Sequence, residues 1–368
     1  MTMQPLMNRG QPSRTGRLPL TFAGFDADWL TDRLRPRYPG AVIHAIELIA
    51  EVYGHTSKAR YKLDRNAAAI EAGIPAQVCV KANWTGDPLS SMVCVNEARF
   101  YWLLRDQLDL PAPHCLVADW DDDAQGMQGF VLMEDLVPLG GTFGGSGQFV
   151  SLDEMASSLA QLARLHGNTW NVPELYDHGW LQTAMAPDTF TDDYWALMHD
   201  YVPRHNARAE HLKRLPDWAA EDPNRLHQAF RKLCSQEMAD SGPLCLVHGD
   251  AHLGNSYRPR DGNRIWFDWQ IVRKGRPWRD VSYFVAGSLT VEQRRRAERD
   301  LICHYCDEMA KYGVALDLDT AWIDYRRWIL WGVIAWHLNI NPNEDTLLVL
   351  ERFGQAARDH ELGGIYGF

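Results

Sequence analysis

The chain has 368 residues, 46% of them hydrophobic, and its formal net charge is −11. This length is sufficient to bury one large core or two linked lobes. The acidic balance argues against a general nucleic-acid-binding protein, because such a protein would present a basic face.

The N-terminal stretch MTMQPLMNRGQPSRTGRLPL has scattered Arg and Pro residues and no apolar segment of the signal-peptide type. We expect residues 1–20 to form a disordered tail. No run of about 18 uncharged apolar residues occurs, so no membrane-spanning helix is expected. The seven cysteines, an odd number at irregular positions, are typical of reduced thiols in a cytoplasmic protein.

Two helices are predicted between Phe25 and Glu51 from apolar residues at helical spacing. The first pattern comprises Trp29, Leu30 and Leu34, and the second comprises Val42, Ile43, Ile46 and Ile49. Residues 52–63, VYGHTSKARYKL, then indicate a strand, a polar turn and a second strand. Backbone N–H groups of this turn and the hydroxyl of Thr56 or Ser57 are candidates to bind phosphate groups. The turn has one glycine and no G-x-G-x-x-G pattern, so this signal is weak by itself.

Lys81 lies in a strand-like run, QVCVKAN, in which it alternates with Val78 and Val80 and therefore faces away from them. A lysine within an apolar strand requires an anionic partner. The phosphoryl-transfer arrangement of kinases provides two such partners, namely nucleotide phosphates and a glutamate on the following helix. The alternative is that Lys81 lies at a strand edge and extends into water.

The candidate glutamate is Glu97, in the segment VNEARFYWLLRDQL, whose apolar residues recur at helical spacing. Glu71 is a rival if the strands pair in a different register. Either residue would position the Lys81 ammonium group by forming an ion pair with it.

The most informative stretch runs from Leu246 to Gln270, LVHGDAHLGNSYRPRDGNRIWFDWQ. A short apolar run leads to Asp250, Asn255 follows, and a second apolar run leads to Asp268. Carboxylate and amide oxygens are hard ligands of the kind that Mg²⁺ prefers, usually together with substrate phosphates. The spacing matches the kinase pattern H-R-D-x-x-x-x-N followed by a metal-binding Asp, with Gly249 in place of the Arg.

Two other interpretations of this stretch remain open. His248, Asp250 and His252 alternate as H-x-D-x-H, which in a strand would place three metal ligands of a metallohydrolase on one face. That interpretation explains neither the spacing to Asn255 and Asp268 nor Lys81. The second alternative is a nucleotide-binding protein that no longer transfers phosphate.

HGDAHLGN followed by FDWQ resembles the aminoglycoside phosphotransferase and choline-kinase superfamily, and within it most closely the ecdysteroid-kinase-like branch. Asp280, in the similarly placed P-x-x-D stretch, follows Asp268 by only twelve positions. This short interval leaves little room for a peptide-docking activation loop. Together with Gly249, it argues against a protein kinase.

The resemblance implies an α+β, two-lobed protein-kinase-like fold. Residues 21–134 would form a small, β-rich, nucleotide-binding N-lobe, and residues 135–368 a larger, mainly helical C-lobe with the catalytic loop and the acceptor pocket. The strand GFVLMEDL resembles the family's lobe-joining hinge, so the backbone at Met133, Glu134 and Leu136 would contact the adenine base.

The implied activity is ATP-dependent transfer of the γ-phosphate to a hydroxyl of a small molecule. Asp250 would accept or orient the hydroxyl proton, Asn255 and Asp268 would hold Mg²⁺, and Lys81, positioned by Glu97, would bind phosphates.

The resemblance and the tryptophan-rich segment AWIDYRRWILWGVIAWHLNI favour a hydrophobic alcohol, sterol-like or hydroxyacyl, as the acceptor. The acidic balance also permits an aminoglycoside or another amino-alcohol. The expected partner is this small molecule, with no nucleic acid and no membrane, and no pattern indicates an oligomeric state.

Overall fold

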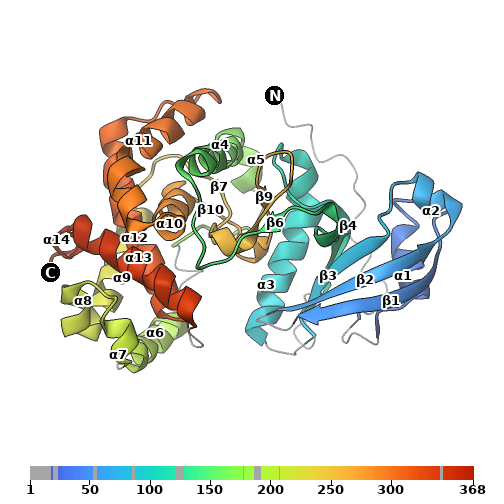
Figure 1. Cartoon of the computed structure of the whole chain (residues 1–368), viewed down its shortest axis with the longest axis horizontal. Helices are drawn as coiled ribbons and strands as arrows, with labels where there is room; N and C mark the ends of the chain where they lie inside the picture. Colours follow the sequence, from blue (N-terminus) through green and yellow to red (C-terminus); the bar gives the residue numbers. More distant parts are fainter. Residues whose placement is uncertain are drawn as a thin grey trace. The chain divides into compact units, whose positions relative to one another are not determined.

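The computed structural model describes residues 18–19, 24–52, 56–84, 88–121, 128–176, 178–185, 192–206, 208–339 and 343–368. Most of the predicted tail lies outside the described residues. Internal contacts divide the chain into two compact units, whose elements are labelled in Figure 1. The first, here called the sheet unit, comprises Met1–Thr142 and Pro259–Val272. The second, the helical unit, comprises Phe143–Arg258 and Arg273–Phe368.

The sheet unit contains a five-stranded antiparallel sheet in the order β1-β2-β3-β5-β4. Its strands are β1 (Ile43–Val52), β2 (Ser57–Arg65), β3 (Gln77–Ala82), β4 (Cys115–Asp121) and β5 (Gln128–Glu134). The predicted strands around the polar turn and at Lys81 are therefore present. The chain is a mixed α+β protein, with its large sheet in the N-terminal part and mainly helices in the C-terminal part.

The second helix predicted between Phe25 and Glu51 is wrong, because that segment forms strand β1. Its pairing with β2 has register shifts between Ile43 and Ala45 and between Leu48 and Ala50. These irregularities interrupt the two-residue alternation of a strand, so the isoleucines fall at a spacing that resembles a helix. β-branched residues favour a pleated surface, and pairing with β2 determines the outcome.

The first predicted helix is confirmed as α1 (Ala27–Leu34), which begins after Asp26. The Asp26 side chain accepts a hydrogen bond from the Trp29 amide at 2.8 Å, as an N-cap residue does. Leu30 and Leu34 are buried in a core shared with side chains from the sheet. Those side chains come from β2, β3 and β5 and include Tyr61, Val78, Val80 and Phe130.

Helix α3 (Pro88–Arg99) packs against β5 and continues as a π-helix over Phe100–Leu104 and a 3₁₀ turn over Arg105–Gln107. Short α2 (Ala67–Glu71) connects β2 to β3. The remaining short elements of this part are a 3₁₀ turn at Val137–Leu139, β6 (Thr142–Phe143), β9 (Ile265–Trp266) and a 3₁₀ turn at Trp269–Ile271.

The helical unit is built mainly from helices, with α11 packed on α4 and α12 packed on both α10 and α13. Its helices are α4 (Leu152–Asn168), α5 (Pro173–Tyr176), α6 (Asp192–Asn206), α7 (Ala209–Leu212), α8 (Asp217–Glu221), α9 (Pro223–Ala239), α10 (Trp278–Ser288), α11 (Val291–Ala310), α12 (Leu318–His337), α13 (Glu344–Asp359) and α14 (Leu362–Tyr366). Its short strands are β7 (Cys245–Val247), β8 (Ser256–Arg258) and β10 (Arg273–Gly275), and β7 pairs antiparallel with β10.

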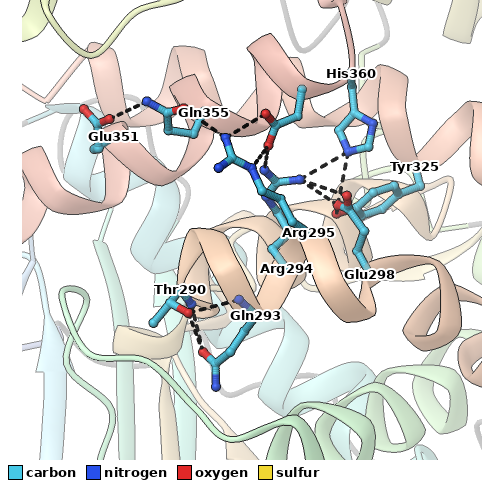
Figure 2. A network of polar contacts seen from close by, with 10 residues as sticks. Thr290, Gln293, Arg294, Arg295, Glu298, Tyr325, Glu351, Gln355 and His360 are labelled. Carbon is cyan, nitrogen blue, oxygen red and sulfur yellow. Dashed lines mark hydrogen bonds and ion pairs between the residues drawn. The ribbon is translucent and has the colours of Figure 1, made fainter.

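A buried polar network connects α11, α12 and the end of α13 (Figure 2). The Arg294 guanidinium donates to Glu298 at 2.9 and 3.0 Å and also pairs with Asp359. Glu298 accepts a further hydrogen bond from the Tyr325 hydroxyl at 2.8 Å and lies 3.1 Å from His360 Nε2. Because the buried charges are paired and hydrogen-bonded, the network fixes the relative placement of these helices at low electrostatic cost.

None of the helices in the described ranges combines the length and the apolar character needed to cross a membrane. All seven cysteines are free.

Candidate functional site

Strand β7 leads directly into His248, Gly249 and Asp250. The turn is held by Asp280 of α10, whose carboxylate accepts hydrogen bonds from the His248 amide at 2.6 Å and the Gly249 amide at 2.8 Å. Gly249 has a φ of +85°, a left-handed conformation in which a side chain would be strained. The backbone before Asp250 is therefore held by two charge-assisted hydrogen bonds and a glycine.

Asp280 is itself fully buried and contacts His166 of α4, whose Nε2 lies 3.2 Å from the Asp280 carboxylate. The other ring nitrogen of His166 lies 2.8 Å from the Tyr305 hydroxyl. Burial alone would raise the pKa of Asp280, but the hydrogen bonds and the neighbouring histidines lower it below its usual value. Asp280 is thus ionised, and it stabilises the turn by accepting the two amide hydrogen bonds.

Asn255 lies in a 3₁₀ turn (Leu253–Asn255) and faces back to Asp250. Its amide nitrogen donates to the Asp250 carbonyl oxygen at 3.1 Å and to the Asp250 carboxylate at 3.0 Å. The amide NH₂ is therefore occupied, and the amide oxygen is the ligand that Asn255 would offer to a cation. The Asp250 side chain remains 24% exposed, so a substrate can reach it.

The two histidines beside Asp250 make local hydrogen bonds through their Nδ1 atoms. His252 accepts from the Gly254 amide at 3.0 Å, and His248 lies 3.3 Å from the Asp250 amide nitrogen. Within the described residues, no group of three or more His, Cys, Asp or Glu side chains is arranged to hold a metal ion. The H-x-D-x-H pattern consequently has no support as a preformed zinc site.

Arginine and aromatic side chains of α10 and α12 lie around the turn. The tryptophans of α12 belong to the tryptophan-rich segment noted in the sequence, whereas Arg279 and Tyr283 could not be identified from it. Arg279 donates to the Gly249 carbonyl at 3.1 Å, and its guanidinium lies 4.1 Å from the ring centroid of Trp331. Burial raises the pKa of Tyr283 well above 10.0, and the negative charge of Asp250 adds to this effect. The ring of Trp336 lies 5.4 Å from that of His252. Asp250 is therefore bordered by apolar aromatic surface.

The second group of predicted site residues lies in the sheet unit. The Lys81 ammonium nitrogen, on β3, lies 2.5 Å from Glu97 of α3 and 2.5 Å from Asp268. Lys81 and Glu97 are 3% and 1% exposed, so this is a buried cluster. Glu71, the rival partner, is exposed on α2. The structure therefore pairs Lys81 with Glu97, and Lys81 does not extend into water.

The charges of this cluster stabilise one another. Burial alone would lower the pKa of Lys81, but Asp268 and Glu97 raise it above its usual value. Burial alone would raise the pKa of Asp268, yet Lys81 and Lys58 hold it well below its usual range. Glu97 has a raised pKa because of burial, with Lys81 opposing the shift. Asp268 is accordingly an ionised carboxylate, the form that binds a cation.

Helix α3 also positions the backbone around Asp268. Glu97 accepts a hydrogen bond from the Trp269 amide at 3.1 Å, and the Asn96 amide donates to the Gln270 carbonyl at 2.8 Å. The Trp269 ring stacks on Phe100 with centroids 4.2 Å apart. Asp268 adopts a left-handed conformation with φ of 67°, which is uncommon for a residue other than glycine. Such strain persists where surrounding contacts determine the backbone, and it is frequent at functional sites.

The predicted phosphate turn lies partly outside the described residues, which omit 53–55. Thr56 and Ser57 are both buried, and Ser57 is the first residue of β2, opposite Ala82 of β3. Among the described residues, the Ser57 hydroxyl has no hydrogen-bond partner. Ser57 thus places a buried hydroxyl next to the strand that carries Lys81.

Of the predicted hinge residues, Met133 and Glu134 are the last two of β5, and Leu136 lies just beyond it. Met133 is paired with Cys79 of β3, and the Glu134 amide donates to the His114 carbonyl at 2.9 Å. Leu136 follows and is buried. The segment is thus held against β3 and the residues that precede β4.

A further lysine, Lys58 of β2, was not identified from the sequence. Its ammonium nitrogen lies 3.1 Å from the second carboxylate oxygen of Asp268. Lys58 lies directly opposite Lys81, but this position is evident only from the register in which β2 pairs with β3. In total, the structure groups Asp250 with Asn255 in the helical unit, and Lys58, Lys81, Glu97 and Asp268 in the sheet unit.

Several solved structures match this chain at low sequence identity. A spectinomycin phosphotransferase, solved with ADP and spectinomycin, is 13% identical with a TM-score of 0.50, and the match covers 92% of this chain and 99% of that one. An aminopropanol kinase associated with a microcompartment is 13% identical with a TM-score of 0.48, with coverage of 92% and 98%.

A streptomycin–ATP complex of an aminoglycoside phosphotransferase is 13% identical with a TM-score of 0.49, with coverage of 90% and 96%. No curated protein matches the sequence. The model of the ecdysteroid kinase-like family matches residues 98–317. The fold is accordingly kinase-like. By its match over more than half of its length, the chain belongs to the ecdysteroid kinase-like family.

Proposed function

We propose that this chain is an ATP-dependent phosphotransferase that moves the γ-phosphate of ATP to a hydroxyl group of a small molecule. The observation that carries the proposal is the buried Lys81–Glu97–Asp268 cluster, with both lysine contacts at 2.5 Å. A lysine paired with a helix glutamate next to a metal-binding aspartate is the arrangement that protein kinases use for phosphoryl transfer. The ecdysteroid kinase-like family is a family of small-molecule phosphotransferases.

In this proposal Asp250 accepts the proton of the acceptor hydroxyl or orients that hydroxyl for attack. Its carboxylate is 24% exposed and is held by Asn255, so it is both reachable and oriented. Asp280 positions it indirectly through the two amides of the preceding turn. Positioning and charge neutralisation supply most of the rate enhancement in phosphoryl transfer, and these few groups are sufficient for that purpose.

The nucleotide would be bound mainly by residues of the sheet unit. Lys81 would bind the α- and β-phosphates, Thr56 and Ser57 would contact phosphates at the turn, and the backbone at Met133, Glu134 and Leu136 would contact the adenine. Asn255 and Asp268 offer an amide oxygen and a carboxylate, a hard-oxygen set that fits Mg²⁺ and leaves its other positions for phosphates. When bound, Mg²⁺ would neutralise the phosphate oxygens as charge develops on them.

The acceptor that best fits the helical unit is a hydrophobic alcohol, sterol-like or hydroxyacyl. Trp331, Trp336 and Tyr283 border the catalytic-loop turn, and aromatic side chains supply large apolar contact surfaces. An aminoglycoside or another amino-alcohol is the second candidate, because the chain carries a net charge of −11.

The experiment is a screen for ATP consumption with sterols, hydroxy acids, choline-like alcohols and aminoglycosides, with Asp250→Asn as the blank. We expect acceptor-dependent ADP formation with one class and a phosphorylated product by mass spectrometry. Stoichiometric Zn²⁺ with no binding of Mg·ATP would indicate a metallohydrolase. Binding of ATP without transfer to any acceptor would indicate a nucleotide-binding protein without catalysis.

A further inference from the structure

Two lysines of adjacent strands in the sheet unit share a single carboxylate. Lys58 of β2 and Lys81 of β3 are direct cross-strand partners in the antiparallel register. Side chains of such partners emerge on the same face, with Cβ atoms about 4.5–5.5 Å apart. Their neighbours Ala59 and Val80 are buried in the hydrophobic core on the opposite face. The pairing thus brings two ammonium groups together.

Asp268 lies between these ammonium groups. One carboxylate oxygen is 2.5 Å from Lys81 Nζ, and the other is 3.1 Å from Lys58 Nζ. The two lysines differ in exposure, because the Lys81 side chain is 3% exposed whereas that of Lys58 is 37% exposed. Lys58 is therefore the member of the pair that an incoming anion can reach from solvent.

The charges of this cluster determine which kind of ligand the two lysines need when a metal ion binds to Asp268. In the present state the two ammonium groups are balanced by Asp268 and Glu97. Like charges placed directly opposite each other on a sheet are destabilising, so the lysines need an anion between them. A divalent cation bound to Asp268 would engage the carboxylate and add positive charge. Both lysines then need a polyanionic ligand as their counter-ion in place of Asp268.

We infer that Lys58 is a second nucleotide-phosphate-binding residue, which pairs with Asp268 when the nucleotide is absent and with phosphate oxygens when it is bound. This inference rests on the proposed function. Lys58 contributes the second positive charge for the triphosphate, because Lys81 is partly neutralised by Glu97 at 2.5 Å. Lysine suits this role, since its ammonium group is a mobile point charge on a flexible stem.

The other basic residues on this face of β2 are engaged elsewhere. Arg60 donates to the buried carboxylate of Asp135 at 2.8 Å. Lys62 has a 64% exposed side chain and lies 3.9 Å from the exposed Glu47. Lys62 therefore shares the strand, the face and the charge of Lys58 but not its contact with Asp268, which makes it a matched control.

The experiment compares ATP and adenosine binding to the wild-type chain, Lys58→Met, Lys58→Arg and Lys62→Met. Dissociation constants are measured by titration calorimetry, once in EDTA and once with Mg²⁺, and thermal melting confirms that each variant is folded. Loss of one charge-assisted phosphate contact is expected to weaken ATP binding about tenfold in Lys58→Met. Adenosine binding should stay unchanged, Lys58→Arg should retain most of the ATP affinity, and Lys62→Met should match the wild type.

Equal ATP affinity in Lys58→Met and the wild type would overturn the inference. Tighter ATP binding in Lys58→Met would overturn it as well, because Lys58 would then only compete with the ligand for Asp268. A wild-type chain that binds no ATP at all would instead refute the proposed function, so the two failures are distinguishable.

Discussion

The ammonium nitrogen of Lys81 lies 2.5 Å from the carboxylate of Glu97, and both side chains are almost completely buried. An ion pair removed from water in this way is costly to break, because the remaining charge is left uncompensated. The pair connects strand β3 to helix α3, and Glu97 also accepts the Trp269 amide next to Asp268. One glutamate thus positions both a lysine and the backbone of a second acid.

Replacing Glu97 with Gln should therefore damage both stability and nucleotide binding. We expect Glu97→Gln to lower the free energy of unfolding by about 2 kcal/mol, because the charge-assisted contacts of Glu97 with Lys81 and the Trp269 amide are weakened while Asp268 still pairs with Lys81. The KM for ATP should rise because Lys81 loses its positioning partner. Denaturant unfolding and steady-state kinetics measure the two effects. The exposed Glu71→Gln is the control and should change neither, and equal behaviour of the two variants would show that Glu97 has no special role.

Asp280 determines the backbone that precedes Asp250. In Asp280→Asn, one of the two acceptor oxygens for the His248 and Gly249 amides is replaced by an NH₂ group. We expect a loss of about 2–3 kcal/mol in unfolding free energy, because buried donors are left unsatisfied. The kcat should fall while nucleotide affinity is retained, since Asp280 holds the turn before Asp250 and is not among the residues proposed to bind the nucleotide. Asp300→Asn, at an exposed position of α11, provides the control and should have wild-type stability and kcat.

Gly129 of β5 marks a close approach to helix α3. A Cβ atom at this position would lie 2.1 Å from the carbonyl carbon of Cys94 and 2.4 Å from the Val95 amide nitrogen. Both are backbone atoms, so the clash cannot be relieved by a side-chain rotation. Gly129→Ala should destabilise the chain by about 3 kcal/mol through overpacking. In Gly364→Ala a Cβ would meet nothing within 4 Å, so this variant should melt close to the wild type.

Glu237 of α9 gives a pH-dependent prediction. Burial raises its pKa to about 7, although Arg327 and Arg276 lie 3.6 and 3.8 Å away and oppose the shift. A raised native pKa means that the folded chain retains the proton that the unfolded chain releases near pH 4.5. This contribution to stability is therefore present at low pH and is lost as pH rises through about 7.

Between pH 5 and pH 8, stability should thus fall by about 2–3 kcal/mol through Glu237 alone. Glu237→Gln removes the titrating group. The unfolding free energy of this variant minus that of the wild type should therefore increase by the same amount between pH 5 and pH 8. Chemical denaturation at several pH values measures it. Glu292→Gln, exposed on α11, should leave the wild-type pH profile intact. A profile unaffected by Glu237→Gln would show that Glu237 is ionised throughout.

Most of the site residues that could be predicted from the sequence belong to local motifs. Asp250, Asn255 and Asp268 were identified because carboxylate and amide side chains follow two apolar runs at a characteristic spacing. Lys81 was identified because a lysine within an apolar strand demands an anion. The structure brings Lys81, Glu97 and Asp268 together, although Glu97 could not be separated from Glu71 without the strand register.

The features that the sequence could not predict depend on long-range pairing. Lys58 contacts Asp268 only because β2 pairs with β3 in one particular register. Arg279 and Tyr283 reach the surroundings of Asp250 because α10 packs behind the turn. Strand β1 was mistaken for a helix because its register shifts interrupt the alternation on which strand recognition depends.

Transfer of the γ-phosphate of radiolabelled ATP by Asp250→Ala, with its ATP dissociation constant measured in parallel, decides whether Asp250 is the catalytic group. Asp261→Ala, at an exposed position, is the matched control. We predict that kcat falls by about 10²–10⁴-fold in Asp250→Ala, the usual contribution of a positioned general base. Its affinity for ATP should stay within about twofold of the wild type, because in the proposed function the lysine cluster, and not Asp250, binds the phosphates. Near-normal turnover in Asp250→Ala would refute the assignment of Asp250 and the mechanism built on it.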